Sequence, residues 1–205
     1  MGVGFGGSAI YNRASPSSHD RCVARIVRDY MTPVTARPIR ILDIGGTAQG
    51  FRAHAALPAG CQVIVANPEA SAEADCRYVS DIPLTAERFD FAMLFGVMMY
   101  LERAPLVSLM RDVRQRLRGQ GTLLIAEPNP EGVLGQVEIA AKRVYAAIVS
   151  LWDPTRFTFY SIADTTGMAR EAGFSQVRER ADLTPNAMGV FPPPMPPYFV
   201  MAVSG

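Results

Sequence analysis

The residues with the clearest potential for chemistry lie in one stretch, Ile39 to Gly50, where an apolar, strand-like run meets closely spaced glycines. Asp43 stands near the end of the run, and Gly45 and Gly46 follow it. A strand that passes through a glycine turn into a helix leaves backbone N–H groups free at the helix start, and these favour an anionic group. The stretch therefore predicts a ligand site at the end of the first strand.

The glycine spacing disfavours two common ligand classes. A phosphate-binding loop has Lys and then Ser or Thr after its last glycine, whereas Phe51 and Arg52 follow Gly50. A dinucleotide-binding loop has Gly-x-Gly-x-x-Gly, and the order Gly45, Gly46, Gly50 does not fit it. A nicotinamide-dependent oxidoreductase is therefore the least favoured function.

S-adenosylmethionine suits the stretch better, because its amino-acid end carries a carboxylate beside an ammonium group. Free amides at the helix start attract the carboxylate, and the neighbouring Asp43 attracts the ammonium. Taken alone, the stretch is also compatible with a tight turn in another kind of α/β protein.

Strand-like and helix-like segments alternate along the chain, which predicts a parallel sheet with crossover helices. Strands are expected at 39–44, 63–66, 89–95, 122–126, 176–179 and 198–203. The proline cluster 192–197 must connect the last two strands, and so short a connection predicts an antiparallel final strand.

Two helices are well marked. The first has Pro105 in its first turn and is expected to end at Gly119. Three arginines complement the carboxyl end of its dipole: Arg114, Arg116 and Arg118. The second follows Ser161, which forms a capping-box pattern with Asp164, and it ends at Gly173.

The order of further segments carries a family resemblance. They read Leu42-Asp43-Ile-Gly45-Gly46, Val65-Ala-Asn67-Pro68-Glu69, Ser80-Asp81-Ile-Pro83, Glu87-Arg-Phe89-Asp90, Val97-Met-Met-Tyr100-Leu101, Leu117 to Asn129, and Arg170-Glu-Ala-Gly173-Phe174. In this order and spacing the chain resembles the class I S-adenosylmethionine-dependent methyltransferases, small-molecule branch, from about Pro38 onward. The resemblance implies an α/β, Rossmann-like fold: a seven-stranded, mostly parallel sheet with its last strand antiparallel, helices on both faces and an N-terminal helical cap. The expected division is 1–36 as extension or cap and 37–205 as the S-adenosylmethionine-binding domain, with an insertion at 129–160.

The resemblance also implies site residues for the cofactor S-adenosyl-L-methionine, across the carboxyl ends of the first strands. Three positions match the loop that holds the methionine end: Asp43, Gly45 and Gly46. Asn67 stands where an acidic residue usually holds the ribose hydroxyls, and Asp81 stands near the residue that contacts the adenine amino group. Phe95 and Gly96 match the segment beneath the cofactor.

Two departures leave a second function open. Thr47 and Gln49 occupy positions that are often glycine, and Asn67 lacks the charge that makes a carboxylate the stronger acceptor. Glu69 could compensate. The alternative is a methyltransferase-fold protein that binds a ligand or a partner without methylating it.

The predicted function is methyl transfer to an O, N or C atom of a small metabolite, in bacterial secondary metabolism. Methyl transfer is a direct displacement, so alignment and desolvation carry much of the catalysis, and a base is needed only for a protonated acceptor. Candidate catalytic residues are His19, Tyr11 and Tyr160, with surface, capping or packing roles as the alternatives. Phe95-Gly96-Val97-Met98 replaces the Asn/Asp-Pro-Pro-aromatic motif of the nucleic-acid amino-methyltransferases, which argues against a nucleic-acid base as acceptor.

Composition limits the partners. The formal net charge is +1 and the basic residues are scattered, which argues against nucleic acid. The three cysteines, Cys22, Cys61 and Cys76, lack metal-ligand spacing and indicate reduced thiols of a cytoplasmic protein without a metal. The apolar stretch 137–152 contains Lys142 and Arg143, which argues against a membrane span. Its apolar residues predict either a wall of the substrate pocket or a homodimer face.

Overall fold

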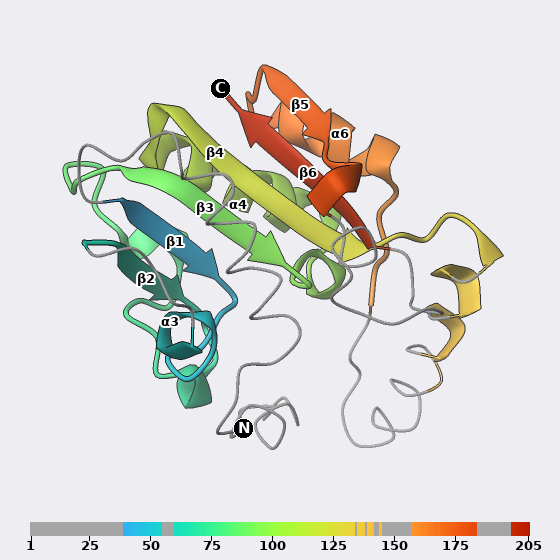
Figure 1. Ribbon diagram of the computed structural model, residues 1–205, viewed down its shortest axis with the longest axis horizontal. Coiled ribbons are helices and arrows are strands. Elements are labelled where there is room, and N and C mark those ends of the chain that lie inside the picture. Colours follow the sequence, from blue (N-terminus) through green and yellow to red (C-terminus); the bar gives the residue numbers. More distant parts are fainter. Residues whose placement is uncertain are drawn as a thin grey trace.

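The computed structural model describes residues 39–54, 60–133, 135–137, 139–141, 144, 157–183 and 198–205. Six strands of this part form one sheet in the order β2-β1-β3-β4-β6-β5 (Figure 1). Their bounds are β1 Arg40–Ile44, β2 Gln62–Ala66, β3 Phe89–Phe95, β4 Leu117–Pro128, β5 Gln176–Glu179 and β6 Tyr198–Ser204.

Strand directions agree with the expected topology. β1 pairs in parallel with β2 and β3, and β3 pairs in parallel with β4. β6 runs antiparallel to both β4 and β5, which confirms the prediction for the last strand. The carboxyl ends of β1, β2, β3 and β4 therefore meet at one edge of the sheet, where open α/β sheets bind ligands.

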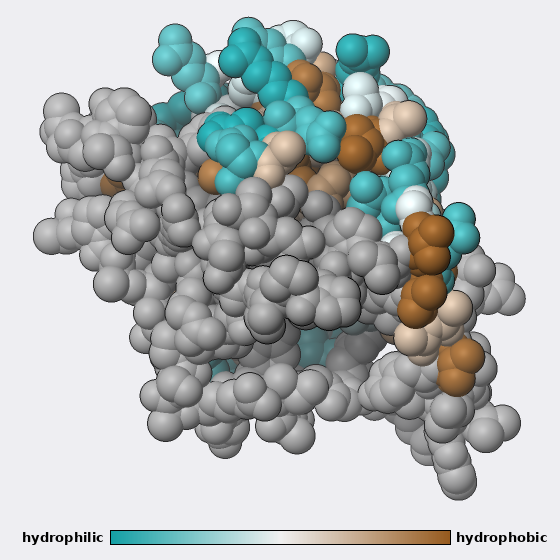
Figure 2. Space-filling view, turned by 45° about the vertical axis from the view of Figure 1, so that its right-hand side comes forward, coloured by the Kyte–Doolittle hydropathy of each residue, from teal (hydrophilic) through white to brown (hydrophobic). Residues whose placement is uncertain are grey.

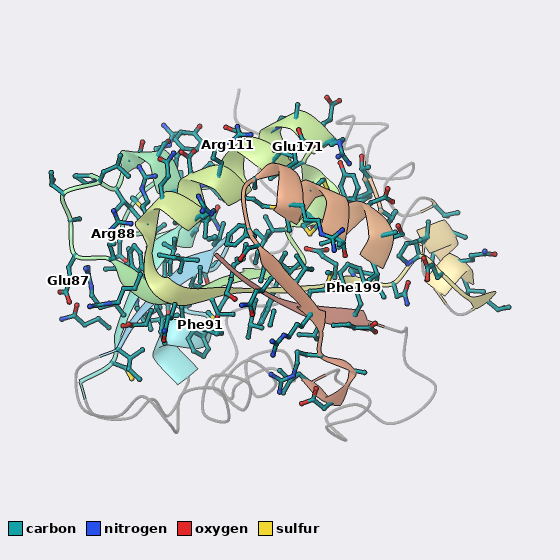
Figure 3. The ribbon with its side chains drawn as sticks, turned by 90° about the horizontal axis from the view of Figure 1, so that it is seen from above. Glu87, Arg88, Phe91, Arg111, Glu171 and Phe199 are labelled. Atoms are coloured by element: carbon teal, nitrogen blue, oxygen red, sulfur yellow. The ribbon has the colours of Figure 1, made fainter. Side chains whose placement is uncertain are left out.

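The core lies on both faces of the sheet because successive strand residues point to opposite sides. Helices α4 (Arg103–Arg116) and α6 (Ile162–Glu171) cover one face, and the short helix α3 (Phe51–His54) lies on the other (Figure 3). Leu42 and Phe199 belong to the buried cluster under α4 and α6, whereas Ile41 and Phe91 pack with Phe51.

A seventh strand was expected, and the described residues contain six. Beyond β2, the part of the chain that the structure describes adds one parallel bridge, between Ala66 and Cys76. The Asp75 carboxylate accepts a hydrogen bond from the Val65 backbone N–H at 2.8 Å and pairs with Arg52 at 2.6 Å. A charged side chain on the outward N–H of β2 protects this edge from pairing with another strand.

The helix before β4 ends earlier than predicted. α4 ends at Arg116, and Leu117 is already extended and paired with Phe89. Gly119 therefore does not end the helix: it lies in β4, inside a break in register, since the next pair is Phe91 with Thr122. Arg118 likewise lies in β4.

The capping box of α6 is confirmed. The Asp164 N–H donates to Ser161 Oγ at 3.1 Å, and the Ser161 N–H donates to Asp164 Oδ2 at 3.1 Å. The Ser161 hydroxyl also donates to Asp164 Oδ2 at 2.8 Å, and this bond, together with the one from the Ser161 N–H, lowers the pKa of Asp164 below its ordinary value. Gly173 follows the helix with φ +99°, a conformation that suits glycine.

The expected cap at 1–36 and the connection at 192–197 lie outside the described residues, so the domain division stays a prediction. Within 133–144 of the insertion, the described residues are helical, and Val133, Val137 and Val144 are exposed. In Figure 2 the described part of the visible face is mostly hydrophilic, and hydrophobic residues lie along its right-hand edge. No helix among the described residues is long and apolar enough to cross a bilayer.

Candidate functional site

The glycine loop predicted from the sequence lies at the carboxyl end of β1. Asp43 is 8% exposed, and a Cβ on Gly46 would collide with its carboxylate. Gly45 has φ +79°, in the left-handed region that residues with a side chain rarely adopt. Both glycines are therefore required by the backbone, one by a close approach and the other by its conformation.

The segment after β2 holds this loop in place. The Asn67 side-chain Nδ2 donates to the carbonyls of Gly45 and Gly46 at 3.1 and 2.8 Å, and its Oδ1 accepts from the Glu69 N–H at 2.9 Å. Asn67 thus contacts the loop with its donor group. Sequence reasoning had predicted a contact between its oxygen and the ribose hydroxyls, which stays a prediction.

Two backbone hydrogen bonds add to this attachment. The Gly45 N–H donates to the Ala66 carbonyl at 2.8 Å, and the Ala48 N–H donates to the Ala72 carbonyl at 2.9 Å. Ala72 ends the 3₁₀ turn η1 (Ala70–Ala72). The loop between β1 and α3 is therefore fixed along its length from the β2 side.

The turn after β3 is the second element of the candidate site, beside the glycine loop. Phe95 is half-buried at the end of β3, and the Gly96 N–H donates to the Ala126 carbonyl at 2.9 Å. Gly96 has φ +66°, and a Cβ built on it would meet no atom of the described residues within 4 Å. A Cβ on Gly45, by contrast, would collide with Val97 Cγ2. The turn thus packs on the glycine loop through Val97, and the described residues leave the space around a Cβ of Gly96 open.

Glu127 joins this turn to β4, and sequence reasoning did not assign it a role. It is 3% exposed, and its Oε1 accepts hydrogen bonds from the N–H groups of Val97 and Met98 at 2.7 and 2.8 Å. The available sequence signal was a carboxylate at the end of an otherwise apolar strand, since a buried carboxylate requires hydrogen-bond partners.

Residues 157–160 contact η3 (Met98–Tyr100), which follows this turn. The Thr158 N–H donates to the Met99 carbonyl at 2.9 Å, and the Tyr100 and Phe157 rings meet edge to face, with centroids 5.3 Å apart. Tyr160 donates its hydroxyl to the Leu101 carbonyl at 3.0 Å. Burial raises the pKa of Tyr160 above its ordinary value.

Most predicted cofactor residues gather at this edge of the sheet: Asp43, Gly45, Gly46, Asn67, Phe95 and Gly96. Asp81 lies in η2 (Val79–Asp81), where it accepts a hydrogen bond from the Tyr78 N–H at 2.8 Å. Arg116, at the end of α4, donates to the carbonyls of Ser80 and Ile82 at 3.0 and 2.8 Å, so Asp81 lies beside that helix end. Its predicted adenine contact stays a prediction. His19 and Tyr11 lie outside the described residues.

Three features of the candidate site bear on the kind of ligand that it would hold. It combines the buried Asp43 carboxylate, the open space over Gly96 and the buried Thr47 Oγ1, for which the described residues supply no hydrogen-bond partner. An unused hydroxyl in a ligand loop matches a ligand that brings polar atoms of its own.

The described residues contain no group of three or more His, Cys, Asp or Glu side chains arranged to hold a metal ion. Cys61 and Cys76 are free, and burial raises the pKa of both thiols. Raised thiol pKa values disfavour the thiolate and hence nucleophilic reactivity.

Comparison with known proteins agrees with this geometry. A family model described as a methyltransferase domain matches residues 18–179 of the 205. No curated protein matches the sequence significantly.

Solved structures of similar fold are methyltransferases. The plantazolicin methyltransferase BpumL, solved with a pentazolic desmethyl plantazolicin analogue and S-adenosylhomocysteine, has a TM-score of 0.67 at 12% identity, and the match covers 97% of this chain and 89% of BpumL. A methyltransferase from Archaeoglobus fulgidus scores 0.58 at 14% identity, covering 91% of this chain and 94% of its own. A Nostoc punctiforme protein provisionally named an O-methyltransferase scores 0.60 at 12% identity over 91% of this chain, which spans only 56% of that protein. At such identities the likeness shows the fold.

Proposed function

Because this chain belongs to the methyltransferase domain family, we propose that it transfers a methyl group from S-adenosylmethionine to an O, N or C atom of a small metabolite. The observation that carries the proposal is the packing of Val97 against Gly45, which brings the glycine loop and the turn after β3 together beside the open space over Gly96. Two loops that meet at the carboxyl edge of a parallel sheet form the usual ligand crevice of this architecture.

The residues of the glycine loop suit the amino-acid end of the cofactor. Asp43 supplies a negative charge for the ammonium group, and its partial desolvation strengthens that attraction. The Thr47 hydroxyl is a donor for the carboxylate. Gly96 leaves room for the ligand above the end of β3. When bound, S-adenosylmethionine supplies a methyl group on a positively charged sulfur, which an aligned nucleophile displaces.

We infer that the methyl acceptor binds against η3 and residues 157–160, here called the acceptor side, and that it is an apolar or aromatic small molecule. Tyr100 is 45% exposed, and Phe157 and Phe159 extend its aromatic surface, with ring centroids 6.5 Å apart. Aromatic faces bind planar or apolar ligands through burial and ring contacts. BpumL, a methyltransferase of similar fold, binds a pentazolic desmethyl plantazolicin analogue together with S-adenosylhomocysteine, and by analogy we propose a role in secondary metabolism.

The catalytic requirement on this chain is alignment and exclusion of water. His19 and Tyr11 remain our candidates for a base. Tyr160 already donates its hydroxyl to Leu101, so we assign it to the support of the acceptor side. We further propose that the protein acts in the cytoplasm and not on nucleic acid, in keeping with its net charge of +1.

The experiment is a transfer assay with S-adenosylmethionine that carries an isotopically labelled methyl group. The full chain is incubated separately with the small-molecule, protein and nucleic-acid fractions of a bacterial extract, and labelled products are identified by mass spectrometry. We expect label in the small-molecule fraction only. Label confined to another fraction would refute the acceptor class.

A second function is favoured by one observation: the donor group of Asn67 is committed to the glycine loop. In that case the protein binds S-adenosylmethionine, or a related ligand, without methylating. Saturable binding without label transfer to any fraction is the result that would favour this alternative.

A further inference from the structure

Glu127 lies between the sheet and the turn after β3. In sequence it is distant from both predicted ligand loops. It is the second-last residue of β4, and its Oε1 bridges the N–H groups of Val97 and Met98. Charge-assisted hydrogen bonds of this kind are stronger than neutral ones and fix direction as well as distance. The two bonds therefore set where residues 97 and 98 lie relative to the end of the sheet.

The preceding β4 residue reinforces the attachment. The Ala126 carbonyl accepts from the Gly96 N–H at 2.9 Å. Three consecutive N–H groups of the turn are thus satisfied by two consecutive residues of β4. Since Gly96 adopts a left-handed conformation, the direction of the chain after it depends on these partners.

Val97 links the position of the turn to that of the glycine loop by direct packing. Its Cγ2 fills the place that a Cβ of Gly45 would take, so a shift of Val97 opens a gap beside the loop. The same turn continues into the acceptor side through the Met99 carbonyl, which accepts from the Thr158 N–H. Closely packed contacts transmit small displacements because they leave no room for independent movement.

We propose that Glu127 is a positioning residue that holds the turn after β3 against the glycine loop and thereby sets the affinity of the cofactor site. The proposal rests on the proposed function for the identity of the ligand. Glu127 acts on the turn through the backbone N–H groups of Val97 and Met98, from which its Oε1 accepts hydrogen bonds at the reach of a glutamate side chain.

The test compares Glu127→Ala, Glu127→Gln and Glu127→Asp in the full chain, with S-adenosylhomocysteine as the calorimetric probe. Glu127→Ala removes the acceptor, and we expect the Kd to rise about tenfold or more. Glu127→Gln keeps an oxygen at the same reach but gives up the charge, so its Kd should lie between those of the wild type and Glu127→Ala. Glu127→Asp keeps the charge but is one methylene shorter, so we expect a loss close to that of alanine.

The matched control is Asp164→Ala. Asp164 also accepts a backbone hydrogen bond, from the Ser161 N–H, but in α6. Its loss should lower the melting temperature without changing the Kd. An unchanged Kd in Glu127→Ala would overturn the proposal. The proposal would also be overturned if Glu127→Gln bound S-adenosylhomocysteine as weakly as Glu127→Ala while Glu127→Asp bound it normally. That pattern would attribute the effect to attraction between the Glu127 charge and the ligand.

Hydrogen exchange of the ligand-free protein separates this proposal from the proposed function. In Glu127→Gln the amides of Val97 and Ala48 should stay protected, whereas in Glu127→Asp both should exchange faster while Leu124 in β4 stays protected. Faster exchange at Val97 alone would refute the coupling to the glycine loop. If the wild type binds no S-adenosylhomocysteine, the cofactor assignment fails and the exchange data still decide the positioning role.

Discussion

Asn67 donates a hydrogen bond from its side-chain Nδ2 to the Gly46 carbonyl at 2.8 Å. A second bond from the same nitrogen reaches the Gly45 carbonyl at 3.1 Å. This position usually carries an acidic residue in the methyltransferases that the sequence resembles. Here a carboxylate would face two carbonyl oxygens, so the loop requires an amide.

The first prediction concerns Asn67→Asp. Replacing the donor by an acceptor removes both bonds and adds repulsion, which should cost about 1–3 kcal/mol of folding free energy and weaken S-adenosylhomocysteine binding. Calorimetric titration and urea denaturation measure the two effects. If Asn67 instead serves as the ribose acceptor predicted from sequence, the carboxylate would tighten binding, which is the opposite sign.

Asn129→Asp is the matched control for this change. The Asn129 Oδ1 accepts a hydrogen bond from the Glu131 N–H at 2.9 Å, and an aspartate keeps that acceptor. Affinity and stability should both stay at wild-type values.

The second prediction compares two glycines. Gly46→Ala brings a methyl group into the Asp43 carboxylate, so the loop or Asp43 must move. We expect about a tenfold loss of S-adenosylhomocysteine affinity. Gly119→Ala has open space around its new methyl group and should leave affinity unchanged. Equal affinities of the two variants in a parallel titration would place the ligand elsewhere.

The third prediction concerns Tyr160→Phe. Loss of the bond to the Leu101 carbonyl should cost about 1 kcal/mol of stability. The pKa of Tyr160 is raised above its ordinary value of 10.0 in the folded protein, so its contribution is complete below that pH and is lost as pH rises further. Stability curves of the wild type and the variant should therefore converge at strongly alkaline pH. Loss of label transfer without loss of stability would instead support the catalytic role predicted for Tyr160.

The fourth prediction concerns Asp164→Ala in the capping box of α6. Removing the cap should cost about 1 kcal/mol near neutral pH. The pKa of Asp164 lies below the ordinary 3.8, so its stabilisation is present above that pH and is lost as pH falls through the lowered value. Urea denaturation should show the wild type and the variant converging in acid. A constant gap down to low pH would contradict this.

The sheet was predictable because its strands are apolar runs with strong boundaries, such as Phe89–Phe95, and because capping boxes such as Ser161–Asp164 depend on local sequence. The end of α4 was not, since Leu117 and Gly119 suit a helix end and a strand equally well. Tertiary pairing of Leu117 with Phe89 decides between them.

The candidate site was predictable in position but not in detail. Asp43, Gly45 and Gly46 follow from the strand–turn pattern, and the structure places them at the expected edge. The direction of the Asn67 amide and the partners of Glu127 depend on contacts between segments distant in sequence, 21 and 29–30 residues apart. No local pattern encodes such contacts.

Calorimetric titration of the full chain with S-adenosylhomocysteine, beside Asp43→Asn, tests the central claim most directly. We predict saturable binding by the wild type and a loss of about tenfold or more in the variant, because the asparagine side chain keeps the shape of the buried carboxylate but not the charge that attracts the ammonium group. Absence of binding by a folded wild-type protein, or equal affinity of the two proteins, would contradict it.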